Sequence, residues 1–96
     1  MRKITQESIA AFNSNETFSK SNTTVSVTDT TTVLLLHGNS IAFKDRTTGK
    51  VKITHCGWDT TTTKERLNAI DGVSIQQRQF QWYLNDELWH GELIQI

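Results

Sequence analysis

GWDTTTTKERLNAIDGVSIQQRQFQWYLNDELW, residues 57–89, decides the fold, because this stretch holds all three tryptophans, the clearest helix start and the clearest pair of alternating strands. Its threonine run leads into KERLNAI, and Asp71-Gly72 follows. Thr62 and Glu65 have the spacing of a capping box, in which each side chain accepts the backbone N–H of the other residue. Glycine tolerates the left-handed conformation that ends a helix. We therefore expect a helix of about two to three turns here.

This helix would present one apolar stripe to the rest of the chain. Leu67 and Ile70 are three residues apart and share a face, whereas Lys64 and Arg66 should point to water. A helix this short is marginal in water on its own, so it must dock on other structure.

The residues after the helix alternate between apolar and polar side chains, first over 73–77 and then over 80–84. This period predicts two half-buried strands. A two-residue turn at Arg78-Gln79 would put the apolar side chains on one face. The resulting pairs are Val73 with Leu84, Ile75 with Trp82 and Gln77 with Phe80. Arg78-Gln79 is poor turn chemistry, so this register rests on the alternation alone.

The tryptophans divide between core and surface. A turn at Asn85-Asp86 sets Trp82 opposite Trp89, and such aromatic pairs across strands stabilise a sheet by about 0.2–1 kcal/mol. Burial statistics favour the core for Trp82 and leave Trp89 between core and surface. Trp58 lies in a loop, where it either plugs the edge of the core or is an exposed contact residue.

The N-terminal part of the chain predicts a helix and a strand. Residues 4–12 form the helix, with Thr5 as its cap and with Ile9 and Phe12 facing the sheet. A polar loop follows, from which Phe18 returns to the core. Residues 23–28 alternate around two valines and form the first strand.

The next segment, TVLLLHG over residues 32–38, is a short and continuous apolar run. Its length predicts a central strand buried on both faces. Residues 37–40 then form a turn.

A second hairpin combines an apolar face with a basic one. Alternation runs through Ile41 and Phe43 and resumes at Val51 and Ile53, after the loop 47–49. If the glycine takes the left-handed position of this three-residue loop, these side chains share one face. The other face then gathers four cations: Lys44, Arg46, Lys50 and Lys52.

Two interpretations of this basic face remain open. Like charges placed opposite each other cost about 0.2–1 kcal/mol per pair, and in the first interpretation this cost is offset because the cations bind an anion or a nucleic acid. Alternatively, the cations form a solvated outer face whose lysines discourage pairing between sheet edges.

Length and charge exclude several classes of protein. Ninety-six residues predict a single domain, residues 1–96, with one core. Ten basic and ten acidic residues give zero net charge, which excludes the strong fields of histone-like proteins and DNA mimics.

The single cysteine and the lack of an apolar leader after Arg2 and Lys3 indicate a reducing compartment. No segment approaches the roughly 18 apolar residues of a membrane helix.

The candidate chemical groups do not form a recognisable catalytic pattern. Three histidines and Cys56 lack the spacing of zinc ligands, so we expect no metal and no cofactor. Cys56 is more simply a small buried apolar residue than a nucleophile that a remote histidine activates. The glycines form neither a phosphate loop nor a dinucleotide motif. We therefore expect that the protein is not an enzyme.

Several motifs in order resemble a family of short proteins from tailed bacteriophages. They are LHGN with Ile41-Ala42, GW at 57–58, TTKERLN at 62–68, Gly72-Val73 with Ile75 and Gln77, WYLN at 82–85, and Trp89 with Gly91. The family prefers glycine at the position of Asp86, which weakens the prediction of a strict type I′ turn there. The resemblance implies a phage product that acts in the bacterial cytoplasm.

These observations predict an α+β domain: a helix, a four-stranded antiparallel stretch, a second helix and a C-terminal meander, with both helices on one face of the sheet. The first functional hypothesis is a non-enzymatic protein that binds a host or phage protein through exposed aromatics and threonine-rich edges. The alternative is a nucleic-acid-binding module, in which the basic face contacts phosphates and Trp58 or Trp89 stacks on bases. A minor hypothesis is an oligomer assembled through an exposed strand edge.

Overall fold

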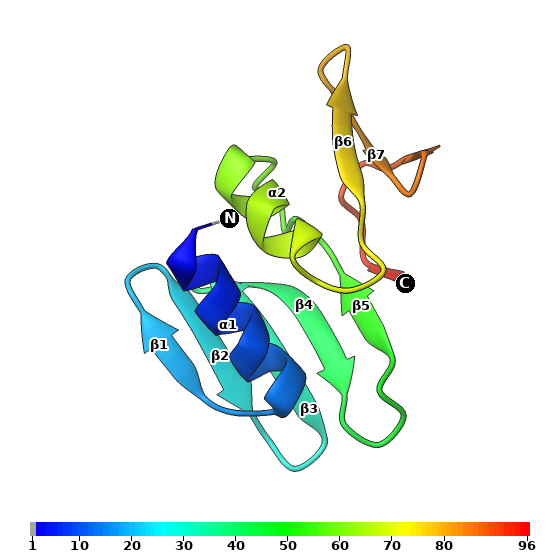
Figure 1. Ribbon diagram of the computed structural model, residues 1–96. Coiled ribbons are helices and arrows are strands. Elements are labelled where there is room, and N and C mark those ends of the chain that lie inside the picture. Colours follow the sequence, from blue (N-terminus) through cyan, green and yellow to red (C-terminus); the bar gives the residue numbers. More distant parts are fainter. Residues whose placement is uncertain (1) are drawn as a thin grey trace.

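Two helices and two antiparallel sheets make up the protein, as a computed structural model of residues 2–96 shows (Figure 1). The larger sheet has six strands, in the spatial order β1 (Phe18–Lys20), β2 (Thr23–Val27), β3 (Thr31–Leu36), β4 (Asn39–Asp45), β5 (Val51–Ile53) and β9 (Ile94–Gln95). The smaller sheet has three, β6 (Ile75–Arg78), β7 (Gln81–Leu84) and β8 (Glu87–Leu88). Helix α1 (Lys3–Ser14) lies across the larger sheet, and α2 (Thr61–Asn68) packs beside it. The predicted α+β class is confirmed.

The C-terminal segment departs from the predicted meander. After β8 the chain returns to the larger sheet, where β9 pairs with β5 and sets Ile94 opposite Ile53. The N–H of Ile96 also donates to the carbonyl of Val51, at 3.0 Å. The chain end therefore ties the smaller sheet to the edge of the larger one.

Helix α1 contributes its predicted face to the core but begins earlier than predicted. Ile9 and Phe12 are buried, as expected. Thr5 is not the cap, because the helix starts at Lys3 and Arg2 occupies the cap position. The Thr5 side chain is instead fully buried, and its hydroxyl donates to Glu65 Oε1 at 2.7 Å.

Strand β3 is central, as predicted, but it is buried on one face only. Leu34 and Leu36 face the helix and are buried, whereas Val33 and Leu35 are partly exposed on the opposite face. The helices cover a single face of the larger sheet. The prediction from the continuous apolar run, that β3 is buried on both faces, is therefore wrong.

The cap of α2 is Thr60, two residues before the predicted one. Its Oγ1 accepts the N–H of Thr63 at 3.2 Å. The predicted capping box fails because the Glu65 carboxylate is used elsewhere: it accepts hydrogen bonds from Arg2, Thr5 and Arg66. In a run of four threonines, every residue can cap, so tertiary contacts select the start.

The core contains a buried arginine, Arg66, which the sequence pattern did not predict. It was expected in water, yet only 1% of its surface is exposed. Its Nη1 donates to Thr5 Oγ1 at 2.5 Å and to Glu65 Oε1 at 2.6 Å, and its Nε donates to Thr23 Oγ1 at 3.2 Å. One guanidinium thus joins α1, α2 and β2. Leu67 on this helix and Ile70, just beyond its C-cap, are both buried as predicted.

The surroundings of Glu65 and Arg66 shift the pKa values of both ionised groups. The hydrogen bond from Thr5, together with Arg2 and Arg66 nearby, holds the pKa of Glu65 below its ordinary value. Burial lowers the pKa of Arg66, and the neighbouring Arg2 adds to this effect. Within residues 2–96, no buried polar side-chain atom lacks a hydrogen-bond partner, so the buried guanidinium of Arg66 leaves no buried donor unpaired beside the partly exposed Glu65.

Candidate functional site

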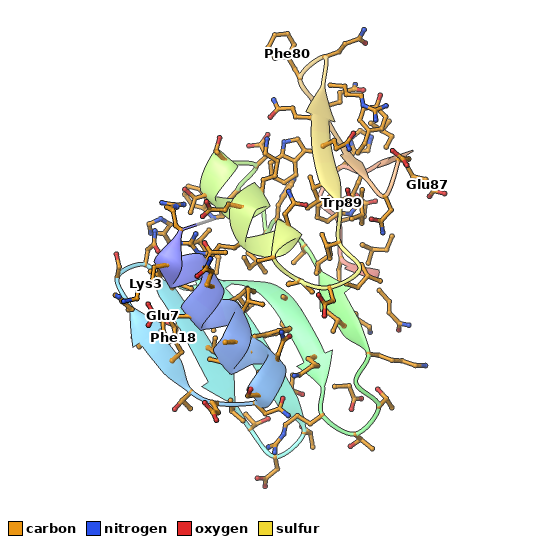
Figure 2. The ribbon with its side chains drawn as sticks, in the orientation of Figure 1. Lys3, Glu7, Phe18, Phe80, Glu87 and Trp89 are labelled. Carbon is orange, nitrogen blue, oxygen red and sulfur yellow. The ribbon has the colours of Figure 1, made fainter. Side chains whose placement is uncertain are left out.

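The β6–β7 hairpin stands out from the body of the protein and carries an exposed aromatic residue at its tip (Figures 1 and 2). Phe80 is 96% exposed. It was predicted to pair with Gln77 on the core face, but the turn consists of Gln79 and Phe80 themselves, which have φ values of 51° and 66°. Figure 2 shows the ring at the end of the hairpin, away from both helices.

The turn of this hairpin lies one residue later than predicted, so each residue of β6 pairs two residues further along β7 than expected. Ile75 pairs with Leu84, and Gln77 pairs with Trp82. Moving the turn by one residue changes the partners but keeps the apolar side chains on one face, so the predicted core face is retained.

Two asparagines fix this register from the base of the hairpin. The side chain of Asn68 bonds both the N–H and the carbonyl of Ile75, at 2.6 and 3.1 Å. Asn85 accepts the N–H of Ser74 at 3.0 Å and donates to the carbonyl of Gly72 at 3.1 Å. The base of the hairpin is therefore held on both strands, while its tip is free to contact another molecule.

The second turn of the smaller sheet forms as predicted. Asn85 and Asp86 have φ values of 50° and 71°, the positive values that a type I′ turn requires. The N–H of Trp89 donates to the carbonyl of Trp82 at 3.0 Å, and the two ring centroids are 6.3 Å apart. The predicted pairing of these tryptophans is confirmed.

The three tryptophans have different environments. Trp82 is buried, as expected. Trp89 is only 3% exposed, and its Nε1 donates to the carbonyl of Glu92 at 2.9 Å, so it does not present a ring face on which a base could stack. Trp58 is 54% exposed, which agrees with the exposed position among the two alternatives left open.

The basic hairpin β4–β5 also pairs one residue out of the predicted register. Phe43 faces Lys52, and Lys44 faces Val51. The cause is Asp45, whose Oδ1 accepts the N–H groups of Thr47 and Thr48 at 2.8 and 3.2 Å. The loop consequently has four residues, 46–49, and is closed by the N–H of Asp45 donating to the carbonyl of Lys50. Gly49 has the predicted positive φ, 76°.

This register separates the four cations that were expected on one face. Lys44 points to α1, where its Nζ donates to the carbonyls of Phe12 and Asn13 at 2.6 and 3.0 Å. Burial, with Arg46 nearby, lowers the pKa of Lys44. Arg46 donates to the carbonyl of Thr28 at 2.6 Å. Lys50 and Lys52 remain together, beside Phe43 in a hollow on the uncovered face of the sheet.

We predict that Lys44→Ala lowers the free energy of unfolding by about 1–2 kcal/mol, because a charged donor to the last carbonyls of a helix stabilises its C-terminus. Lys50→Ala should change it by less than about 0.5 kcal/mol, since this side chain is exposed. Urea denaturation followed by tryptophan fluorescence measures both values. Equal effects of the two substitutions would contradict the assigned orientation of Lys44.

A small pocket lies beneath the tip of the β6–β7 hairpin. Its volume is about 160 Å³, and it is lined by His55, Asp59, Phe80, Gln81, Trp82, Trp89 and His90. The His55 ring lies edge-on to Trp82, with centroids 5.6 Å apart, and its Nδ1 accepts the N–H of Gly57 at 2.9 Å. The alternation of apolar and polar residues could not predict this pocket, because its walls come from three segments that are separate in the sequence.

The reactive groups of the chain are dispersed. Cys56 is exposed with a φ of 55°, contrary to its expected burial. Over residues 2–96, no three His, Cys, Asp or Glu side chains come together in a group that could hold a metal ion. Among the helices described, none is long and apolar enough to cross a membrane.

These features define a small, mostly β, α+β protein with an exposed aromatic hairpin. The family model described as Kyanoviridae Gp96 protein matches residues 1–94, so the chain belongs to this family of phage proteins. The resemblance to short phage proteins is thereby confirmed. Comparison with curated proteins and with solved structures finds no match.

Proposed function

We propose that this phage protein is a non-enzymatic binding protein, which engages a host or phage protein in the bacterial cytoplasm through the tip of the β6–β7 hairpin. The observation that carries the proposal is the 96% exposure of Phe80. A phenyl ring in water contributes nothing to the core, and a residue other than glycine at positive φ costs about 1–2 kcal/mol. The fold thus gains no stability from this side chain at this position.

An aromatic side chain on a supported turn is well suited to bind a protein. Energetically dominant contact residues are often aromatic, and they fill pockets on the partner. The asparagine contacts at Ile75 and Ser74 fix the base of the hairpin before binding, so less conformational entropy is lost in the complex. Further exposed apolar side chains, Trp58 and Leu88, widen the apolar surface available to a partner.

The nucleic-acid alternative receives less support. It depended on four cations on one face, and the observed register turns Lys44 toward α1 and engages Arg46 with Thr28. It also depended on stacking by Trp89, which is buried. Lys50 and Lys52 alone provide too few phosphate contacts for strong, salt-dependent binding.

The test compares Phe80→Asn with the wild-type chain. Asparagine tolerates positive φ, so the variant should unfold within about 0.5 kcal/mol of the wild type. Affinity-tagged protein from infected host cells should recover a stoichiometric partner, and Phe80→Asn should weaken this interaction at least about tenfold, the loss expected for a dominant contact.

Leu93→Asn is the matched control, because Leu93 is also exposed and apolar but lies outside the hairpin. It should retain the partner. Recovery of no stoichiometric partner by the wild type, or equal recovery by Phe80→Asn, would refute the proposal.

A further inference from the structure

The pocket below Phe80 has walls that suit a cationic side chain. Three aromatic residues, Trp82, Trp89 and His55, contribute to its lining, and so does the acidic residue Asp59. The rings pack on one another, with centroids 5.6 to 6.3 Å apart, so this wall is rigid. Among the described lining residues, none is Lys or Arg.

Asp59 has no partner of opposite charge within the protein. Over residues 2–96 it forms no ion pair, whereas Glu7, Glu65 and Asp86 each do. Arg78, the cation of the β6–β7 hairpin, is directed away from Asp59. Its guanidinium lies 5.4 Å from the Tyr83 ring centroid and 3.5 Å from Asp86. The carboxylate is thus available to an external cation.

We propose that this pocket binds an arginine side chain of the partner protein. The inference rests on the proposed function, because it names the group that the partner inserts beside Phe80. Arginine fits better than lysine: its guanidinium is flat, offers five N–H donors and can stack on the partly exposed ring of His55. Asp59 and Gln81 supply acceptor oxygens, and the aromatic wall favours a cation. An acidic side chain would be repelled by Asp59.

The pocket is organised before any ligand binds. The backbone N–H of His55 donates to the carbonyl of Gly91 at 3.1 Å, and the hydroxyl of Thr54 donates to the same oxygen at 2.6 Å. These bonds hold the loop that carries His55 against the loop that carries His90. A preformed site loses less entropy on binding, so even an isolated arginine derivative should bind measurably.

The test uses Nα-acetyl-arginine amide and, as its neutral isostere, Nα-acetyl-citrulline amide. Each is titrated into the full chain while the indole N–H signals of the tryptophans are followed by NMR. Arginine should bind at least about tenfold more tightly than citrulline, because only its charged guanidinium can form a charge-assisted hydrogen bond with Asp59. Asp59→Asn should abolish this preference, and Asp71→Asn, an exposed carboxylate outside the pocket, should retain it.

The outcomes separate this inference from the proposed function. Equal affinity for the two probes overturns the arginine site, and so does a preference that survives Asp59→Asn; the hairpin proposal stands in either case if capture still depends on Phe80. Selective binding of arginine, with capture that is insensitive to Phe80→Asn, overturns the hairpin as the contact element and leaves the arginine site established. Comparison of the two probes on the wild-type chain requires no variant to fold.

Discussion

Replacing Arg66 by alanine should lower the free energy of unfolding by about 3–5 kcal/mol, the range for breaking a buried charged contact and leaving a cavity. The side chain is the largest of the fully buried ones, and it contacts Thr5 on α1, Glu65 on α2 and Thr23 on β2. Without the guanidinium, α1, α2 and β2 lose the hydrogen-bond donor that they share. The alanine also leaves a cavity, which side chains of α2 alone cannot fill. Urea denaturation followed by tryptophan fluorescence gives the value.

Two further variants separate the causes of this loss. Arg66→Met keeps most of the apolar volume but removes the hydrogen bonds, so it should be less destabilising than alanine. Lys64→Ala alters a cation of the same helix whose one hydrogen bond, to Gln77, is exposed, and it should cost less than about 0.5 kcal/mol. If Arg66→Ala behaved like Lys64→Ala, the guanidinium would not lie between the helices and the sheet.

Arg66 also shows where prediction from sequence reaches its limit. Periodicity assigned Leu67 and Ile70 to the buried stripe correctly, but it treats every arginine as a surface residue. The burial of Arg66 depends on hydroxyl groups at Thr5 and Thr23, which are distant in sequence and become neighbours only in the folded chain. No local pattern contains that information.

The registers of both hairpins illustrate a second limit. Alternation identified the strands and the core face of β6–β7, because parity survives when the turn moves by one residue. It could not fix the partners. These depend on side-chain hydrogen bonds to backbone, from Asp45 in one hairpin and from Asn68 and Asn85 in the other.

The candidate site was only partly predictable for the same reason. Exposed Trp58 was one of two alternatives that the loop position left open, while Phe80 looked like a strand residue because it continued the alternation. Its exposure follows from the turn position alone, so an error of one residue concealed the most accessible aromatic side chain. The basic residues were assigned to the wrong face for a similar reason, because the loop after Asp45 has four residues and not the predicted three.

Gly91→Ala should also be strongly destabilising, by about 2–5 kcal/mol, as the sum of two effects. Position 91 has a φ of 84°, which costs an alanine about 1–2 kcal/mol. A Cβ there would lie 1.9 Å from two ring atoms of His55, and overpacking of this kind costs about 1–3 kcal/mol. The ring cannot easily retreat, because it packs against Trp82 and Trp89 and accepts the N–H of Gly57.

Gly49→Ala is the matched control for Gly91→Ala, since Gly49 has a similar φ, 76°, but no atom within 4 Å of an added Cβ. It should show the conformational cost alone, about 1–2 kcal/mol. In a His55→Ala background the clash disappears, so the cost of Gly91→Ala should fall to that of Gly49→Ala. Equal costs for the two glycine substitutions in the wild-type background would contradict the packing of Gly91 on His55. The arginine pocket would then lose the contact that holds its histidine in place.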